Sequence, residues 1–344
     1  MESLILLMLG TTVLTFFALV FLKPFSEAVG LNDIPDSRKN HESPVPAVGG
    51  LAVFFGLAAS TLAFVPFDSD SISYFSGAMM CVLLGVIDDR NGLSAKFKLV
   101  AQVFITLFLC MQMEHFLFNL GDLVGTGDIY LGSASYALTA LAVIGAINSF
   151  NMLDGLDGLV GGVALVIFAS MAFLFSANGI SFDMMLAMAL AVALIPYLLM
   201  NLTIPPFKTK VFLGDAGAML IGYSVVWLLI GGTQTSSPSF TPAAALWLVG
   251  LPLMDMASVM IHRVKAGHSP LEADHRHIHH RLLAAGFSKK AVLAIVSFLA
   301  FVMAGLGVLG CVLNVPQPLM FASFMLAFIL YNAIVGQIKS NSVV

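Results

Sequence analysis

Long apolar segments constrain this chain more than any other feature of its sequence. A helix needs about 20 mostly apolar residues to cross the hydrocarbon core of a bilayer, and eleven segments approach or reach this length. We place them at residues 3–22, 47–66, 73–87, 97–120, 132–150, 158–177, 182–201, 215–233, 242–261, 291–313 and 318–336. Only 10% of the residues are charged, compared with about 25% in soluble domains. We therefore expect an all-α polytopic membrane protein, with a single membrane-embedded domain over residues 1–344.

The basic residues indicate how the chain is oriented. If the N-terminus lies outside, all 15 lysines and arginines fall in, or at the edge of, loops on the cytoplasmic side. The outside segments carry acidic residues instead, including Glu2, Asp68 and Asp183. Because cytoplasmic loops are enriched in lysine and arginine, this pattern predicts an odd number of spans, an outside N-terminus and a cytoplasmic C-terminus.

The most informative polar stretch runs from residue 148 to residue 159. Asn148, Asn151, Asp154 and Asp157 recur every third residue. A 3₁₀ turn would align all four, whereas on an α-helix the row drifts by roughly 60° per step. Such a stripe at the end of a membrane span is a functional-site hypothesis. The alternative is that one of these residues caps the next span while glycines close a turn.

Two predicted cytoplasmic loops add further acidic and basic groups. In the first loop, Arg38, Lys39 and His41 form a cationic group, and such a group also serves simply as a topology signal. The second loop opens with Asp88 and Asp89. Adjacent carboxylates on a helix point about 100° apart, so a symmetric grip on one ion is not expected.

The remaining polar groups lie in the later cytoplasmic loops. Asp215 starts a span, where it is either a site residue or a simple N-cap. Residues 261–290 carry six of the eight histidines, interleaved with Arg263 and other basic residues. His277 and His280 would share a helical face. Nearby thiols and an HExxH motif are absent, so this loop suits an anionic phosphate better than zinc.

One membrane face would thus display many carboxylates beside cationic groups. Mg²⁺ prefers oxygen ligands and usually binds through one or two carboxylates plus substrate phosphates. A magnesium-bridged diphosphate flanked by cations is the arrangement that phosphoryl transfer needs. At a membrane surface, this site would let a soluble nucleotide meet a lipid phosphate.

Four motifs together resemble those of the polyprenyl-phosphate N-acetylhexosamine-1-phosphate transferases. They are Asp88-Asp89, the NxxNxxDGxDGL stretch from Asn148 to Leu159, Phe212-Leu213-Gly214-Asp215 and His277-Ile278-His279-His280. The resemblance covers nearly the whole chain, and the HIHH form is similar to that of the GlcNAc-1-phosphate branch. It implies an eleven-span fold in a bacterial inner membrane, with the active site facing the cytoplasm. The implied reaction transfers GlcNAc-1-phosphate from UDP-GlcNAc to undecaprenyl phosphate, as the first lipid-linked step of O-antigen or a similar surface polysaccharide.

The resemblance also implies roles for particular residues. Asp215 is the expected Mg²⁺ ligand, with Asn151 as a second ligand and Mn²⁺ as a substitute ion. The expected catalytic carboxylates are Asp88, Asp89, Asp154, Asp157 and Asp215, of which Asp88 and Asp89 would orient or deprotonate the lipid phosphate. The expected substrate-binding residues are Lys98 for the diphosphate, Phe212, Gly155 and Asn201 for uridine, and Arg263, His277, His279 and His280 for phosphate and sugar, with Asn148, Arg38, Lys39 and His41 completing the set. A homodimer is a further expectation, and a nucleic-acid partner is not expected.

Other functions leave different signatures. An ion-coupled transporter would place its acids near the bilayer midplane, often in paired repeats, whereas here they crowd at one face. A GxGD protease needs a glycine where Phe212 stands, and a CDP-alcohol phosphotransferase needs Ala-Arg after its Asp-Gly where this chain has Leu156-Asp157. Within the family, another UDP-N-acetylhexosamine or phospho-MurNAc-pentapeptide remains an alternative donor.

Overall fold

The computed structural model describes residues 2–34, 43–66, 68–113, 115–269 and 276–338. The predicted residues Arg38, Lys39 and His41 lie outside these ranges. Apart from two short 3₁₀ turns and a two-stranded antiparallel pairing of β1 (Asn32–Asp33) with β2 (Val45–Pro46), the regular structure within the described ranges is α-helical. Its helices are α1 (Glu2–Leu22), α2 (Gly49–Phe64), α3 (Ser69–Asn91), α4 (Ala95–Met113), α5 (Ser135–Leu153), α6 (Leu159–Ser176), α7 (Phe182–Asn201), α8 (Gly214–Thr233), α9 (Pro242–Leu248), α10 (Gly250–Lys265), α11 (Ile278–Ala284), α12 (Lys289–Val312) and α13 (Gln317–Gln337).

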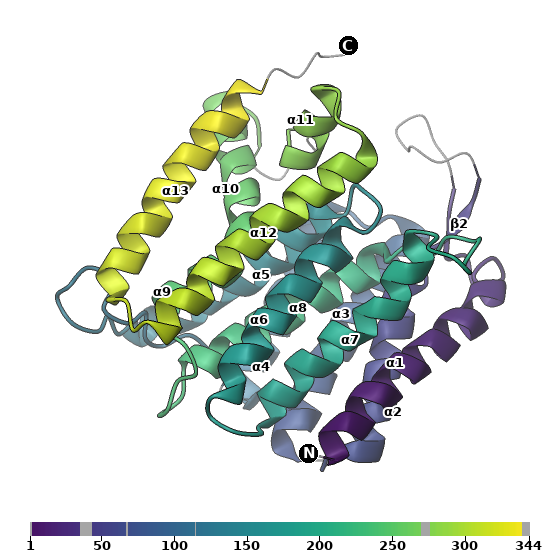
Figure 1. The fold of residues 1–344 in the computed structure, drawn as a ribbon, viewed down its shortest axis with the longest axis horizontal. Helices are drawn as coiled ribbons and strands as arrows, with labels where there is room; N and C mark the ends of the chain where they lie inside the picture. Colours follow the sequence, from purple (N-terminus) through teal and green to yellow (C-terminus); the bar gives the residue numbers. More distant parts are fainter. Residues whose placement is uncertain (1, 35–42, 67, 114, 270–275, 339–344) are drawn as a thin grey trace.

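Each predicted apolar segment contains an α-helix, and the chain is an all-α polytopic membrane protein. Among the described residues, eight helices are long and apolar enough to cross a membrane, or nine if the bent pair α9 and α10 forms one span. The apolar helix α2 has only 16 residues, and α4 lies outside this set, so the count of eleven stays a prediction. The start of α1 and the end of α13 lie at opposite ends of the bundle (Figure 1), as an odd number of crossings requires.

Three segments differ most from their predicted bounds. Helix α3 is 23 residues long rather than short, because Asp68 caps its start and its acidic end stays helical up to Gly92. The segment predicted at 97–120 leaves the helix after Met113. The segment predicted at 242–261 is broken by a 79° bend between α9 and α10. Pro252 has no N–H to donate to the carbonyl group of Leu248, so one helix cannot run straight through the bend.

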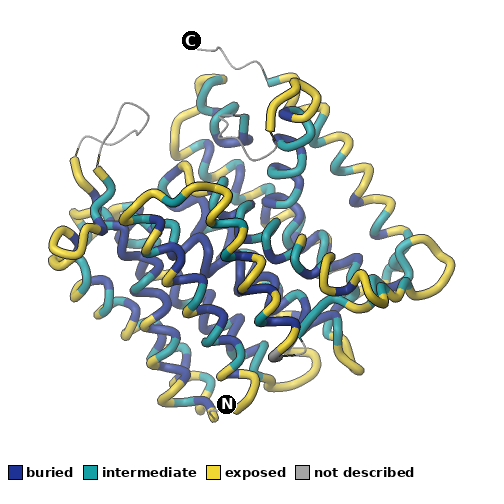
Figure 2. The backbone as a smooth tube through the Cα atoms, turned by 180° about the vertical axis from the view of Figure 1, so that it is seen from behind, coloured by how far each residue is buried: buried dark blue, intermediate teal, exposed yellow. Residues whose placement is uncertain are grey.

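Helix α8 lies at the centre of the bundle and is buried along most of its length. Buried backbone fills the middle of the molecule, and exposed backbone lies on the outer helices and loops (Figure 2). Helices α2, α3 and α5 approach α8 closely because glycines stand at the contacts. A Cβ on Gly50 or Gly85 would overlap the α8 backbone at residues 216–217, and one on Gly222 would lie 2.6 Å from the Cα atom of Ile147. Small residues thus bring four membrane helices into backbone contact.

The loop before α8 is hydrogen-bonded to the segment that follows β2. The N–H of Phe212 donates to the carbonyl oxygen of Pro46 at 2.8 Å, and the N–H groups of Gly49 and Gly50 donate to the carbonyl oxygens of Phe212 and Leu213. A Cβ on Gly49 would lie 2.7 Å from the carbonyl oxygen of Phe212. The start of α8 therefore has a fixed position relative to the ends of α2 and β2.

Candidate active site

A polar pocket of about 570 Å³ opens at one end of the bundle. It is lined by ten residues that the sequence predicted for the site: Asp88, Asp89, Asn151, Asp154, Gly155, Asp157, Asn201, Phe212, Asp215 and His280. These come from the ends of α3 and α5, the α5–α6 connection, the end of α7, the loop before α8, the start of α8, and α11. Convergence of such distant segments is the central requirement of the sequence-based hypothesis, and the structure meets it.

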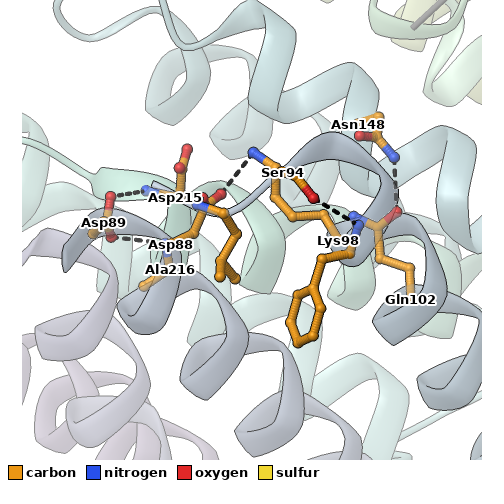
Figure 3. A network of polar contacts seen from close by, with 10 residues as sticks. Asp88, Asp89, Ser94, Lys98, Gln102, Asn148, Asp215 and Ala216 are labelled. Atoms are coloured by element: carbon orange, nitrogen blue, oxygen red, sulfur yellow. Dashed lines mark hydrogen bonds and ion pairs between the residues drawn. The ribbon is translucent and has the colours of Figure 1, made fainter. Parts of the chain in front are cut away.

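Asp88 is held by two donors at the end of α3. Its Oδ2 atom lies 2.7 Å from Nζ of Lys98, and its Oδ1 atom accepts a hydrogen bond from the N–H of Leu93 at 2.8 Å. The residue is only 5% exposed. Lys98 thus reaches the site through Asp88 rather than as a lining residue (Figure 3). A carboxylate held in this way is suited to keeping Lys98 in place.

Asp89 points in a different direction from Asp88, in line with the offset expected for neighbours on a helix (Figure 3). Its two carboxylate oxygens accept hydrogen bonds from the N–H groups of Asp215 at 2.8 Å and Ala216 at 3.2 Å. Asp89 therefore caps α8 from another helix. The N-cap interpretation of Asp215 is wrong, because no side chain of the α8 N-cap residue caps this helix and Asp215 is itself a recipient of the cap.

The glycine before Asp215 is required by this arrangement. Gly214 has a φ of +74°, and a Cβ there would lie 2.7 Å from Oδ2 of Asp89. Any larger residue would push the capping carboxylate away from α8 and would also adopt a disfavoured left-handed backbone. The sequence Gly214-Asp215 thus places the Asp215 carboxylate at the N-terminus of α8, in the pocket.

The stretch from Asn148 to Leu159 divides into a helix end and a turn. Helix α5 is α-helical up to Leu153, so Asn148 and Asn151 lie on its last turns. Asn148 is outside the pocket lining and donates to Oε1 of Gln102 at 2.9 Å. Helix α6 begins after Gly158, which has a φ of +74° and supplies no side-chain cap. The capping alternative for the asparagines and aspartates is therefore wrong.

Asn201 and Lys210 fix this turn against the loop before α8. Asn201 is 2% exposed, accepts a hydrogen bond from the N–H of Gly158 at 2.6 Å and donates to the carbonyl oxygen of Val211 at 2.8 Å. Nζ of Lys210 lies 2.7 Å from Oδ2 of Asp157 and 5.8 Å from the ring centre of Phe212. Asn201 therefore positions two loops, and Lys210 brings a cation beside the aromatic wall of the pocket.

The pocket concentrates negative charge. Six of its lining residues are aspartates: Asp33, Asp88, Asp89, Asp154, Asp157 and Asp215. Asp154 lies in the connection after α5 and is exposed to the pocket. Desolvation within the pocket, followed by the negative charges of Asp89 and Asp157, raises the pKa of Asp154 above its usual range. Carboxylates crowded in this way gain from a bound cation, which offsets their mutual repulsion.

The histidine segment, at the start of α11, reaches the pocket through His280. His277 precedes α11 instead of lying on it, so its predicted shared helical face with His280 is wrong. The rings of His277 and His279 are stacked at 6.0 Å and 11°, and His279 lies against Gly155 so closely that a Cβ there would overlap it. His280 lines the pocket, while the buried residues Arg263, His277 and His279 lie outside its lining.

Sequence reasoning did not assign roles to Asp33, Lys210 or Lys289, which also line the pocket. Lys210 lies two residues before Phe212 of the aromatic motif, and Lys289 starts α12. All three fall in predicted cytoplasmic loops, so proximity to the other motifs was the available signal. A different signal concerned Asp255, an acidic residue inside an apolar segment, which is by default a functional-site hypothesis.

The fold and the pocket define a class of protein: a polytopic membrane protein in which carboxylates, amides and lysines from distant helices share one pocket. Comparison with known proteins agrees with this class. The protein-family model described as Glycosyl transferase family 4 matches residues 71–233 of this chain. The undecaprenyl-phosphate alpha-N-acetylglucosaminyl 1-phosphate transferase of Salmonella typhi is 37% identical over 336 residues, covering 96% of this chain and 90% of the relative.

The proteins of the same name from Escherichia coli strain K12 and Pasteurella multocida are also similar. They are 37% and 36% identical, each over 96% of this chain, and the match covers 89% and 92% of the relatives. The chain therefore belongs to the polyprenyl-phosphate N-acetylhexosamine-1-phosphate transferase family, as its four motifs predicted.

The hydrogen bonds by which Asp89 caps α8 can be tested by substitution. Replacing Asp89 with alanine removes both acceptors, so we expect a loss of about 1 to 2 kcal/mol in stability and a large drop in transferase turnover, because Asp215 moves with the helix start. Asp68→Ala is the matched control, since Asp68 caps the opposite end of the bundle, at the start of α3. It should lower the thermal unfolding temperature and leave turnover unchanged. Equal turnover in the two variants would contradict a positioning role for Asp89.

Proposed function

We propose that this protein transfers GlcNAc-1-phosphate from UDP-GlcNAc to undecaprenyl phosphate, forming undecaprenyl-diphosphate-GlcNAc and releasing UMP. The observation that carries the proposal is the pocket, in which the four family motifs meet. The relatives at 35–37% identity bear the name of this transferase and align over nearly the whole chain. The product would be the first lipid-linked intermediate of O-antigen or a similar surface polysaccharide.

We propose Mg²⁺ as the cofactor, with Mn²⁺ as a substitute, held by Asp215 and Asn151. Both residues line the pocket, and their carboxylate and amide oxygens are donors that Mg²⁺ prefers. No cage of three or more histidine, cysteine or acidic side chains occurs among the described residues. The pair Asp215 and Asn151 fits Mg²⁺, which takes one or two protein ligands and completes its coordination shell with phosphates and water. When bound, the ion would neutralise charge on the diphosphate.

The proposed chemistry is a single displacement. An oxygen of the lipid phosphate attacks the phosphorus that carries the sugar, a new P–O bond forms, and the bond from this phosphorus to the bridging oxygen breaks, so that the bridging oxygen leaves with UMP. The second pKa of a phosphate monoester is about 6, so much of the acceptor is already dianionic at neutral pH. Asp88 is then needed less as a base than as the residue that holds Lys98 near the reacting phosphates.

We further propose that the pocket faces the cytoplasm at the bacterial inner membrane. Lys98 pairs with a pocket residue, and Lys210 and Lys289 line the pocket, so basic residues gather at this end of the bundle as expected for a cytoplasmic face. A soluble UDP-sugar would reach the pocket there, beside the phosphate of a lipid in the inner leaflet. The homodimer stays a prediction.

The decisive experiment measures UMP release by the purified protein in detergent. We expect release with UDP-GlcNAc, undecaprenyl phosphate and Mg²⁺ together, none when any one is omitted, and recovery after chelation when Mg²⁺ or Mn²⁺ is added back. UDP-GalNAc and UDP-MurNAc-pentapeptide serve as competing donors. A phospho-MurNAc-peptide product would assign the other branch, ion transport without UMP release would overturn the function, and a trapped aspartyl phosphate would overturn the single displacement.

A further inference from the structure

A buried carboxylate outside the pocket connects three helices. Asp255, on α10, is only 2% exposed. Its Oδ2 atom lies 2.7 Å from Nδ1 of His277, and its Oδ1 atom accepts hydrogen bonds from the N–H of Ile278 at 2.9 Å and from the hydroxyl group of Tyr331 at 2.8 Å. These donors come from the start of α11 and from α13. We call Asp255, His277 and Tyr331 the Asp255 clamp.

The Asp255 clamp contacts the pocket through the histidine rings. The ring centres of His277 and His279 are 6.0 Å apart and their planes differ by 11°. The ring centres of His279 and His280 are 4.1 Å apart. His280 lines the pocket, and His279 packs against Gly155, which lines it too. The ring of His279 therefore connects His277 to His280 at the pocket.

Helix α13 is attached to the histidine segment at a second point. Nη1 of Arg281 donates to the carbonyl oxygens of Val335 at 2.7 Å and Ile338 at 3.2 Å, at the end of α13, where a cation is favourable. Apolar burial contributes little here, because only Met320, Phe324 and Val335 of this helix are buried. The hydroxyl group of Tyr331 thus holds α13 to Asp255 on α10, and the side chain of Arg281 holds it to α11.

A capping role alone does not account for Asp255. Capping the N–H of Ile278 uses one oxygen, whereas here both oxygens are used and a charge-bearing group lies within an apolar segment, where it is costly. A carboxylate that accepts from Nδ1 of a histidine fixes the ring orientation and places the proton on Nδ1. The second nitrogen is then presented in a defined state.

We propose that Asp255 and Tyr331 are positioning residues for the transfer reaction. They hold His277 in one orientation and tautomer, and through it they set His279 and His280 against the phosphate and sugar of the nucleotide donor. The proposal rests on the proposed function for the identity of the donor. The position of the His277 ring follows from its hydrogen bond to Asp255 and does not depend on the identity of the donor.

The first test does not depend on activity. Hydrogen–deuterium exchange of residues 276–285 is compared in the wild type, Asp255→Asn and Tyr331→Phe. We expect exchange in this segment to be faster by about tenfold in Asp255→Asn, whose amide group opposes the Nδ1 proton, and by a smaller factor in Tyr331→Phe. Tyr74→Phe is the matched control. It also loses a buried hydroxyl hydrogen bond, the one of 2.6 Å between Tyr74 and Ser224, but this bond lies in another part of the bundle. Unchanged exchange in both variants would overturn the proposal.

The second test separates positioning from general destabilisation. In Tyr331→Phe we expect the KM for UDP-GlcNAc to rise about threefold to tenfold, with the KM for undecaprenyl phosphate within about twofold of the wild type. Added to His277→Gln, Tyr331→Phe should have no further effect, because it acts through that ring. Additive losses, or equal rises in both KM values, would overturn the proposal. A wild-type protein without UMP release would refute the proposed function, while the exchange experiment would still decide whether the Asp255 clamp positions the histidines.

Discussion

Asp215→Asn should lower UMP release by at least about 100-fold, the loss typical when one preorganised electrostatic contact to a developing charge is removed. Asp215 lines the pocket with five other aspartates, and its position is fixed by the cap that Asp89 provides. An asparagine keeps the size and the backbone hydrogen bond but removes the charge that a divalent cation needs. The measurement is kcat as a function of Mg²⁺ concentration, and the variant should also require more Mg²⁺ for half-maximal rate.

The control for this prediction is Asp70→Asn. Asp70 is exposed in the first turn of α3, far along that helix from Asp88, so its charge should not matter to the pocket. Full activity of Asp215→Asn at ordinary Mg²⁺ concentrations would contradict the proposed ligand. Loss of activity in both variants would instead indicate a general sensitivity to surface charge.

The second large effect is expected for Gly85→Ala. A Cβ at this position would overlap the backbone of α8 at Ala216, and backbone cannot move aside as a flexible side chain does. Overpacking of this kind costs about 1 to 3 kcal/mol or more. We expect a marked fall in the thermal unfolding temperature in detergent, together with loss of turnover, because the displaced segment carries Asp215.

Gly305→Ala is the matched control for this substitution. Gly305 lies within α12, and a Cβ there meets nothing within 4 Å. Alanine is favoured over glycine in a helix by about 1 kcal/mol, so this variant should be as stable as the wild type or more so. If Gly85→Ala also retained its stability, the close backbone contact between α3 and α8 would be in doubt.

One physical reason predicted the membrane segments and five acidic pocket residues, whereas Gly155, Asn201 and Phe212 were predicted from the resemblance to the transferase family. Hydrocarbon excludes charge, so long apolar runs mark the helices and the polar residues at their ends mark the surfaces. Asp88, Asp154 and Asp215 were recognisable because each stands at the end of such a run. Their convergence was inferred from the side of the membrane on which they lie, and the pocket confirms it.

Pairings between distant residues could not be predicted in this way. Asp89 accepts a hydrogen bond from the N–H of Asp215, 126 positions later, and periodicity carries no information about such a partner. The bend between α9 and α10 was missed because hydropathy alone does not distinguish a continuous helix from a broken one. The role of Asn201 is similar, since its hydrogen bonds to Gly158 and Val211 depend on how two loops meet.

The order in which the pocket residues occur has a consequence for biogenesis. The lining begins with Asp33 in the first loop and ends with Lys289 at the start of α12. Helices leave the ribosome in sequence, so the early aspartates of the lining are inserted long before its last lysine has been translated. The pocket is therefore completed only late in synthesis, and a nascent chain that ends before α12 would carry an incomplete lining.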